Sequence, residues 1–277
     1  MHSPLIRLLT LQQLGATDFE GQSIDLGTPQ VFGGQVLGQA IQAAQATVDG
    51  RPIHSVHAYF LRRGDFTAPI RYEVDNSRDG RGFSSRRVVA IQHDKQIFTM
   101  SASFQQTEDG MEFQPPYRLP PGPGELPPLP LDVTPEQKAV SPTDDFDLRL
   151  VPKEHRTEAN AVQWWLKTRK PLKSADQAMH RSILGFISDF GLVSAVLQPH
   201  GYEPGNREFL RKLVAASLDH ALWFHRDIKV DDWLLYSTTP KITHGARGLA
   251  AGSIYDASGA LVATTMQELL IRNPQPR

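Results

Sequence analysis

The stretch from Val31 to Val48, VFGGQVLGQAIQAAQATV, decides the fold of the first half of the chain. Its apolar side chains recur at intervals that place them on one face of a helix. They are Val36, Leu37, Ala40, Ile41, Ala44 and Val48. Gly33 and Gly34 precede this pattern, and Asp49-Gly50-Arg51-Pro52 supplies turn residues that end it. The sequence therefore predicts an apolar helix over Gly34–Val48.

Strands are predicted to follow this helix. In Ile70–Val74, apolar residues alternate with Arg71 and Glu73, as in a half-buried strand. The other strands predicted in this half are Ile53–Leu61, Phe83–Gln92 and Gln96–Phe104. The second half repeats the layout, with a helix over Ala175–Leu197, in one or two pieces, and strands over Leu213–Phe224, Trp233–Thr239, Gly248–Tyr255 and Ala260–Ile271. One helix followed by antiparallel strands in each half predicts an α+β fold of two tandem domains, each an antiparallel sheet curled around one central helix.

A proline-rich segment separates the two halves. Its prolines are Pro115, Pro116, Pro120, Pro121, Pro123, Pro127, Pro128 and Pro130. Proline lacks a backbone donor and disfavours helix at the residue before it, so we expect an extended connector outside both sheets. The predicted organisation is a first domain over 1–112, a linker over 113–150, and a second domain over 151–277 that carries the catalytic residues.

Three short segments recur in the same order in both halves, at a nearly constant spacing, which favours a duplicated fold. The pairs are Val31–Gly34 with Asp189–Leu192, His57 with His220, and Arg81-Gly82-Phe83 with Arg247-Gly248-Leu249.

Composition excludes several classes of function. The formal net charge of -1 over 277 residues argues against a nucleic-acid-binding protein. The sequence holds no cysteine, which rules out a thiolate nucleophile and cysteine-bound metal. It also contains neither a His-Glu-x-x-His motif nor a phosphate-binding Gly-x-x-x-x-Gly-Lys-Ser/Thr loop, so we predict no metal and no cofactor. No signal peptide or membrane span is expected from the sequence, and a cytoplasmic location is the expectation.

Several segments together resemble the acyl-CoA thioesterase II family. They are Val31–Ala40, His54–Arg62, Arg78–Gly80, Phe83–Val88, Leu197–Gly201, Leu218–His220, Trp223–Arg226, Trp233–Tyr236, Ala246–Gly248 and Gln267-Glu268. Members of that family are double hot-dog proteins that hydrolyse fatty acyl-CoA thioesters. The resemblance implies two tandem hot-dog domains, an acyl-CoA substrate and, by analogy, a homodimer or larger homo-oligomer.

The resemblance also implies an active site. Its three polar residues, which hold a hydrolytic water, fall on Asp189, Ser217 and Gln267. The repeat places their counterparts in the first half near Val31, His54 and Ser103. The first copy would then lack the carboxylate and the amide and form only a wall of the site.

Without the resemblance, these residues have more than one interpretation. Asp189 shares a helical stripe with apolar residues, so it is either functional or a structural acid at a helix end. Ser217 alone is unremarkable, and Gln267 is either functional or solvent-facing. Asp219 and His220 suggest a Ser-His-Asp set, but adjacent strand residues face opposite sides, which favours structural or supporting roles.

Substrate contacts are predicted at a few further positions. Gly33 and Gly34 could supply a backbone donor to an oxyanion, and His54 could line the pocket. Arginines that could bind the CoA phosphates are Arg62, Arg86, Arg87 and Arg247. Two alternative functions stay open: a hot-dog enoyl-thioester hydratase or dehydratase, and a non-catalytic acyl-CoA-binding protein.

Overall fold

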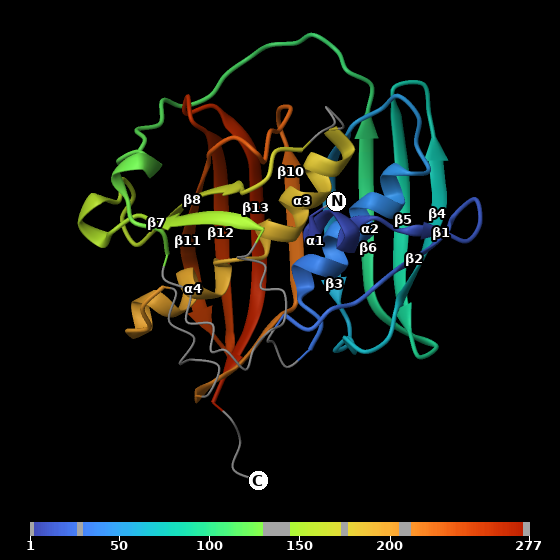
Figure 1. The fold of residues 1–277 in the computed structure, drawn as a ribbon, viewed down its shortest axis with the longest axis horizontal. Helices are drawn as coiled ribbons and strands as arrows, with labels where there is room; N and C mark the ends of the chain where they lie inside the picture. Colours follow the sequence, from blue (N-terminus) through green and yellow to red (C-terminus); the bar gives the residue numbers. More distant parts are fainter. Residues whose placement is uncertain (1–2, 27–29, 130–144, 173–176, 205–211, 274–277) are drawn as a thin grey trace.

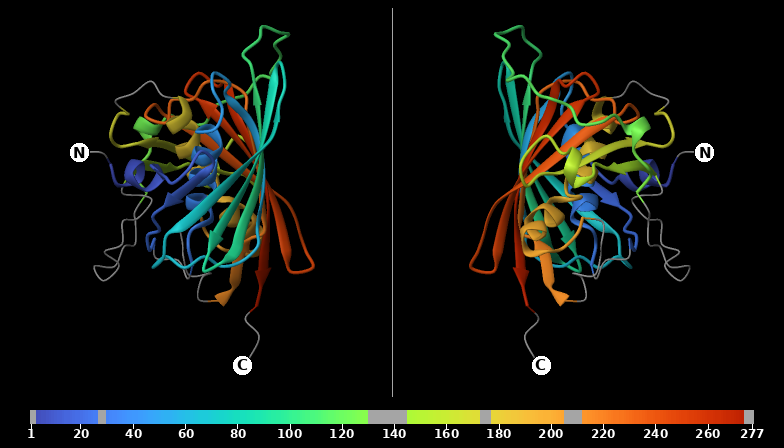
Figure 2. Two further views of the ribbon diagram at one scale, coloured as in Figure 1. Left: turned by 90° about the vertical axis from the view of Figure 1, so that its right-hand side faces the viewer. Right: turned by 90° about the vertical axis from the view of Figure 1, so that its left-hand side faces the viewer.

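The computed structural model describes residues 3–26, 30–129, 145–172, 177–204 and 212–273. The described strands form one strongly curved antiparallel sheet, and the helices lie on one side of it (Figures 1 and 2). The predicted α+β class is therefore confirmed.

The first half follows the predicted order. Its elements are α1 (Pro4–Leu9), β1 (Gln12–Gln13), β2 (Asp18–Gly21), α2 (Gly33–Gln45), β3 (Ile53–Phe60), β4 (Ile70–Asp79), β5 (Phe83–Gln92) and β6 (Lys95–Gln105). The helix predicted over Gly34–Val48 is α2, and its apolar stripe is buried against the sheet. Side chains on β5 alternate between buried and exposed, because successive residues of a strand face opposite sides of the sheet.

The second half repeats this order with additions. Its elements are η1 (Pro123–Glu125), β7 (Phe146–Leu150), η2 (Lys153–His155), β8 (Val162–Thr168), α3 (Gln177–Ser188), α4 (Leu192–Leu197), η3 (Gln198–His200), β9 (Val214–Ser217), β10 (Asp219–Phe224), β11 (Leu234–His244), β12 (Arg247–Asp256) and β13 (Leu261–Arg272). The helical segment predicted over Ala175–Leu197 is two helices, because Gly191 takes a left-handed conformation with φ of 87° between them.

The two halves share one sheet. The strand order is β1-β2-β4-β5-β6-β3-β10-β13-β12-β11-β8-β7, with β9 paired to β13. This order is symmetric about the β3–β10 junction, where His57 lies opposite Ala221. The sequence predicts a curled sheet in each half, and the structure joins the two sheets edge to edge. The strand edge that each half would otherwise leave open is paired with the other half.

Helices α2 and α3 pack against each other over the centre of the sheet (Figure 1). Glycines allow this close approach: a Cβ on Gly38 would lie 2.9 Å from the Ser182 carbonyl oxygen, and one on Gly185 would lie 2.5 Å from Ile41. As a result, the N-terminal end of α2 meets the C-terminal end of α3.

The proline-rich segment crosses over the molecule from the end of β6 to the second half (Figure 1). Its described part packs there: Tyr117 stacks on Tyr255 with ring centroids 3.7 Å apart, and Trp165 Nε1 donates to the Pro121 carbonyl. The prediction that residues 113–150 stay outside the sheet is wrong at its end. Phe146–Leu150 contains no proline, so its backbone donors are available, and it pairs with β8 as strand β7.

In the described part of the chain, one stretch, Gln177–His200, is long and apolar enough to cross a bilayer. Its apolar window is 72% buried inside the molecule, where it forms α3 and α4. The core helix of a soluble protein meets the same criterion.

Candidate active site

The site lies where the two central helices meet. Asp189 directly follows α3, and its Oδ2 accepts a hydrogen bond of 2.9 Å from the backbone N–H of Gly34, in the first turn of α2. The first N–H groups of a helix have no partner inside the helix, and they carry a partial positive charge that favours an anion. The carboxylate of the second half is therefore held by a helix of the first half.

Two strands bring the other predicted residues to this carboxylate. The Ser217 hydroxyl, at the end of β9, donates to Asp189 Oδ1 over 2.9 Å. The Gln267 amide, on β13, donates from Nε2 to Asp189 Oδ1 over 2.8 Å and to Ser217 Oγ over 2.7 Å. Asp189 and Gln267 are buried, and Ser217 is partly buried. The three residues that the family resemblance selects form one connected group.

The other end of the Gln267 amide is also bonded. His220 on β10 places Nδ1 2.5 Å from Gln267 Oε1, and its Nε2 lies 2.9 Å from both Ser188 Oγ and Thr265 Oγ1. Burial lowers the pKa of His220 below its usual value, against the opposite effects of Asp189, the Gln267 hydrogen bond and Asp219. Strand alternation predicts a structural or supporting role for His220. Its contact with Gln267 depends on the register of β10 and β13, which spacing along the chain does not show.

The end of α3 is fixed by a tyrosine. The Tyr236 hydroxyl on β11 donates to the Ser188 carbonyl over 2.6 Å, which satisfies a helix-end carbonyl next to Asp189. Burial raises the pKa of Tyr236 well above its usual value, so the hydroxyl keeps its proton. Neither its distance in sequence nor its apolar surroundings predicts this contact.

Asp219 lies on the face of β10 opposite His220, as strand alternation predicts. A regular strand would also place Asp219 on the face of Ser217, but the strand is interrupted at Leu218, between β9 and β10, and the two side chains do not share a face. Asp219 Oδ1 accepts from the Glu268 backbone N–H over 2.7 Å, while His220 is buried on the helix side. Asp219 and His220 therefore do not form a Ser-His-Asp set.

Gly33 and Gly34 lie against the Asp189 group, and the predicted oxyanion contact of Gly33 stays a prediction. A Cβ on Gly33 would lie 2.7 Å from Asp189 Oδ2, and one on Gly34 would lie 2.1 Å from the Phe186 carbonyl oxygen. The Gly34 N–H donates to Asp189, so this donor is already used inside the protein. Both glycines allow the first helix to contact the carboxylate, and the prediction that Gly34 holds an oxyanion is corrected accordingly.

His54 and Ser103 lie away from this group. His54 sits at a bulge of β3, where its Nε2 is 2.8 Å from Ser103 Oγ and its ring packs edge-on against Phe83. Phe83 and Ser103 alternate with buried neighbours and so face the side of the sheet opposite the helices. The prediction that His54 lines the pocket is therefore wrong.

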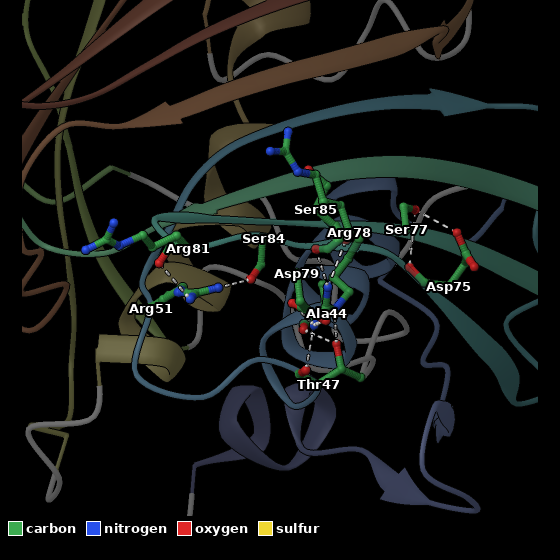
Figure 3. Close-up of polar contacts among 11 residues, drawn as sticks. Ala44, Thr47, Arg51, Asp75, Ser77, Arg78, Asp79, Arg81, Ser84 and Ser85 are labelled. Carbon is green, nitrogen blue, oxygen red and sulfur yellow. Dashed lines mark hydrogen bonds and ion pairs between the residues drawn. The ribbon is translucent and has the colours of Figure 1, made fainter.

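Arg86 is a structural residue rather than a phosphate ligand. It is 3% exposed, and its guanidinium binds Asp79, the backbone and side chain of Thr47, and the carbonyls of Arg78 and Ser85. Figure 3 shows these partners gathered beside the last turn of α2. With all its donors used inside the protein, it has none for a ligand.

Arg247 remains a surface side chain. Its Nε lies 2.8 Å from Glu268 Oε1, and about half of the side chain is exposed. Its predicted contact with CoA stays a prediction.

The symmetry of the sheet changes which first-half residues correspond to Gln267 and Asp189. The last pairs of the two hairpins, Gln92 with Lys95 and Asp256 with Ala260, align β6 with β13. Gln267 then corresponds to Ala102, not Ser103, and His220 corresponds to Val56, which lies opposite Ala102.

The counterpart of Asp189 changes as well. Asp189 follows the end of α3, so its counterpart follows the end of α2 at Ala46, whereas Val31 precedes α2. The conclusion that the first copy lacks both the carboxylate and the amide holds with these corrected positions.

The comparison with known proteins agrees with this architecture. Residues 23–105 match the family model described as the acyl-CoA thioesterase N-terminal domain, and residues 123–271 match the C-terminal domain. The chain belongs to the acyl-CoA thioesterase family. A family relative, acyl-CoA thioesterase 2 of Haemophilus influenzae, is 38% identical over 97% of this chain and 96% of its own length.

Solved structures agree with this assignment to the acyl-CoA thioesterase family. An acyl-CoA thioesterase II from Mycobacterium marinum is 34% identical, covers 99% of both chains and superposes with a TM-score of 0.83. A hot dog fold protein from Alicyclobacillus acidocaldarius shares only 16% identity but has a TM-score of 0.78, which shows the fold alone. The tandem hot-dog fold predicted from the sequence is confirmed.

Proposed function

We propose that this protein hydrolyses acyl-CoA thioesters to a free fatty acid and CoA, using a water activated by Asp189 together with Ser217 and Gln267. Membership of the acyl-CoA thioesterase family supports the reaction class. The observation that carries the mechanism is a buried carboxylate held by three hydrogen-bond donors from α2, β9 and β13.

The donor set leaves Asp189 able to act as a base. A carboxylate has about four lone-pair positions. Within the described residues, Oδ1 accepts two bonds and Oδ2 accepts one, which leaves one position, on Oδ2. A water that donates there lies beside the start of α2 and is oriented by the fixed carboxylate.

The reaction then balances with these groups alone. Asp189 accepts a proton from the water as the water oxygen bonds to the thioester carbonyl carbon. The tetrahedral intermediate collapses, the carbon–sulfur bond breaks, and the CoA sulfur leaves. Asp189 returns the proton to that sulfur, which yields the free acid and the CoA thiol.

The test is free-thiol release from a series of saturated straight-chain acyl-CoAs, measured with purified protein. We expect catalytic release with at least one chain length. Addition of water to an enoyl-CoA without thiol release would instead support a hydratase, and binding without either reaction would support an acyl-CoA-binding protein. The predicted homo-oligomer and the predicted cytoplasmic location stay predictions.

A further inference from the structure

His220 is a buried polar residue that the mechanism above does not use. It is 1% exposed on the helix side of β10, and both ring nitrogens lie within hydrogen-bond distance of polar side chains. A buried polar group is costly to the fold unless it is bonded. The first half places Val56 and Ala102 at the positions of His220 and Gln267, so the fold itself does not require a polar pair there.

The hydrogens of the Gln267 amide determine what His220 must provide. Nε2 carries two hydrogens, and these bond to Asp189 Oδ1 and Ser217 Oγ. Oε1 can only accept, so the His220 Nδ1 that lies 2.5 Å away must carry a hydrogen and donate it. If the amide turned over, Oε1 would face the Asp189 carboxylate and the two would repel each other.

The other side of the ring permits this tautomer. His220 Nε2 faces the hydroxyls of Ser188 and Thr265. Each hydroxyl can donate either to Nε2 or to a backbone carbonyl, at 2.9 Å from Gly185 O and 2.8 Å from Ala221 O respectively. A neutral ring with its hydrogen on Nδ1 therefore satisfies every atom of the group.

We propose that His220 is a positioning residue: its Nδ1–H holds the Gln267 amide in the one orientation that donates to both Asp189 and Ser217. This inference rests on the proposed function, because it assigns His220 a role in orienting the same carboxylate and hydroxyl. His220 acts through Gln267 and takes no proton from the water, since both ring nitrogens are engaged by Gln267, Ser188 and Thr265.

Two substitutions of His220 distinguish the role of Nδ1 from that of Nε2. The Asn side chain places its amide near the position of Nδ1, so His220→Asn keeps a donor to Gln267. Gln reaches the position of Nε2 and lacks a donor at Nδ1. We expect His220→Gln to lower kcat on the order of tenfold with little change in KM, and His220→Asn to recover most of that loss.

A double-mutant cycle tests whether His220 acts through Gln267. If it does, His220→Gln has no further effect on kcat in a Gln267→Ala background. An equal loss in both backgrounds, or equal losses for His220→Gln and His220→Asn, would overturn the proposal.

A second buried histidine is the matched control. His180 on α3 is 4% exposed, and its Nδ1 accepts from the Val230 backbone N–H, away from the Gln267 group. His180→Gln, which likewise removes the polar group at the position of Nδ1, should lower the thermal unfolding midpoint without lowering kcat. A loss of kcat equal to that of His220→Gln would show that the loss follows from removing any buried histidine.

A measurement on the unaltered protein covers the case in which the variants do not fold. Nitrogen NMR of protein labelled at histidine should show His220 neutral with its hydrogen on Nδ1. A hydrogen on Nε2 alone would overturn the proposal. This result does not depend on turnover, whereas the absence of thiol release by the unaltered protein would contradict only the proposed function.

Discussion

Asp189 is a buried carboxylate that accepts three hydrogen bonds, each from a different helix or strand. The Gly34 N–H belongs to α2, the Ser217 hydroxyl to β9 and the Gln267 amide to β13. Fixed donors of this kind hold a charged group in place before a substrate arrives, so little reorganisation is needed during the reaction.

Substitutions of Gln267 and His54 are expected to have contrasting effects on turnover. Gln267→Ala removes two donors from the Asp189 group, and we expect kcat to fall about 100-fold. His54→Ala changes a side chain on the opposite face of the sheet, and kcat and KM should stay within about twofold of their original values. Rate-versus-substrate profiles check both. A large kcat loss in His54→Ala with none in Gln267→Ala would place the site in the first half.

Several individual residues could not be assigned from the sequence. His220 and Gln267 become partners only through the β10–β13 register, and Arg86 is internal only because its strand face lies against α2. The spacing of residues along the chain predicts which of them lie on the same helix or strand. It does not predict which helices and strands pack against each other.

The packing of α2 on α3 determines where Asp189 lies. Gly34→Ala adds a Cβ at 2.1 Å from the Phe186 carbonyl oxygen, so the start of α2 must move away and weaken its bond to Asp189. We expect a loss of about 2 kcal/mol in the free energy of unfolding, together with a kcat at least about tenfold lower.

Denaturant unfolding and thiol release measure the two effects of Gly34→Ala. Gly110→Ala is the control, because nothing lies within 4 Å of a Cβ at that glycine. A Gly34→Ala protein with unchanged stability and unchanged kcat would contradict the role given to this helix contact.

The proline-rich linker predicted over 113–150 is the part of the fold that was predicted least accurately. Tyr117 stacks on Tyr255, donates to Glu158 Oε1 over 2.7 Å and accepts from Gln163 Nε2 over 2.8 Å. We expect Tyr117→Ala to destabilise the protein by about 2 kcal/mol. Tyr117→Phe, which keeps the ring, should cost about 1 kcal/mol. Equal stability of both variants and the original protein in denaturant would show that the connector is not anchored there.

Strand and helix positions followed closely from the sequence, because periodicity and turn residues are local properties. The predicted strand Phe83–Gln92 has the observed bounds, whereas the single strand predicted over Leu213–Phe224 is two strands, β9 and β10. Strands β7 and β8 are not predicted, β7 because it lies beside the proline-rich stretch. The joining of the halves could not be predicted, because it depends on which strand edges remain unpaired after each half folds.

The shared sheet and the contact between α2 and α3 join the two halves, so we expect the whole molecule to unfold in a single cooperative transition. All four tryptophans lie in the second half, at Trp164, Trp165, Trp223 and Trp233, so their fluorescence reports on that half. Far-ultraviolet circular dichroism reports on both halves. We expect the two signals to coincide during unfolding in denaturant. Separate transitions would mean that the halves unfold independently.

The two halves keep one fold with different chemistry. The first copy has an apolar pair, Val56 and Ala102, where the second has His220 and Gln267. The first copy nevertheless contributes the Gly34 N–H to the site. The proposed catalytic group therefore depends on both halves of the chain.

The most direct test of this account is the turnover number of Asp189→Asn for thiol release from acyl-CoA. The amide keeps an oxygen for Ser217 and Gln267 but cannot accept the proton of a water. Its nitrogen faces the Gly34 N–H, and two buried donors that oppose each other should cost about 1–3 kcal/mol in stability. We predict a protein that folds, as judged by its thermal unfolding midpoint, with kcat lower by about 1,000-fold. A folded Asp189→Asn protein with the original turnover would contradict the central role of this carboxylate.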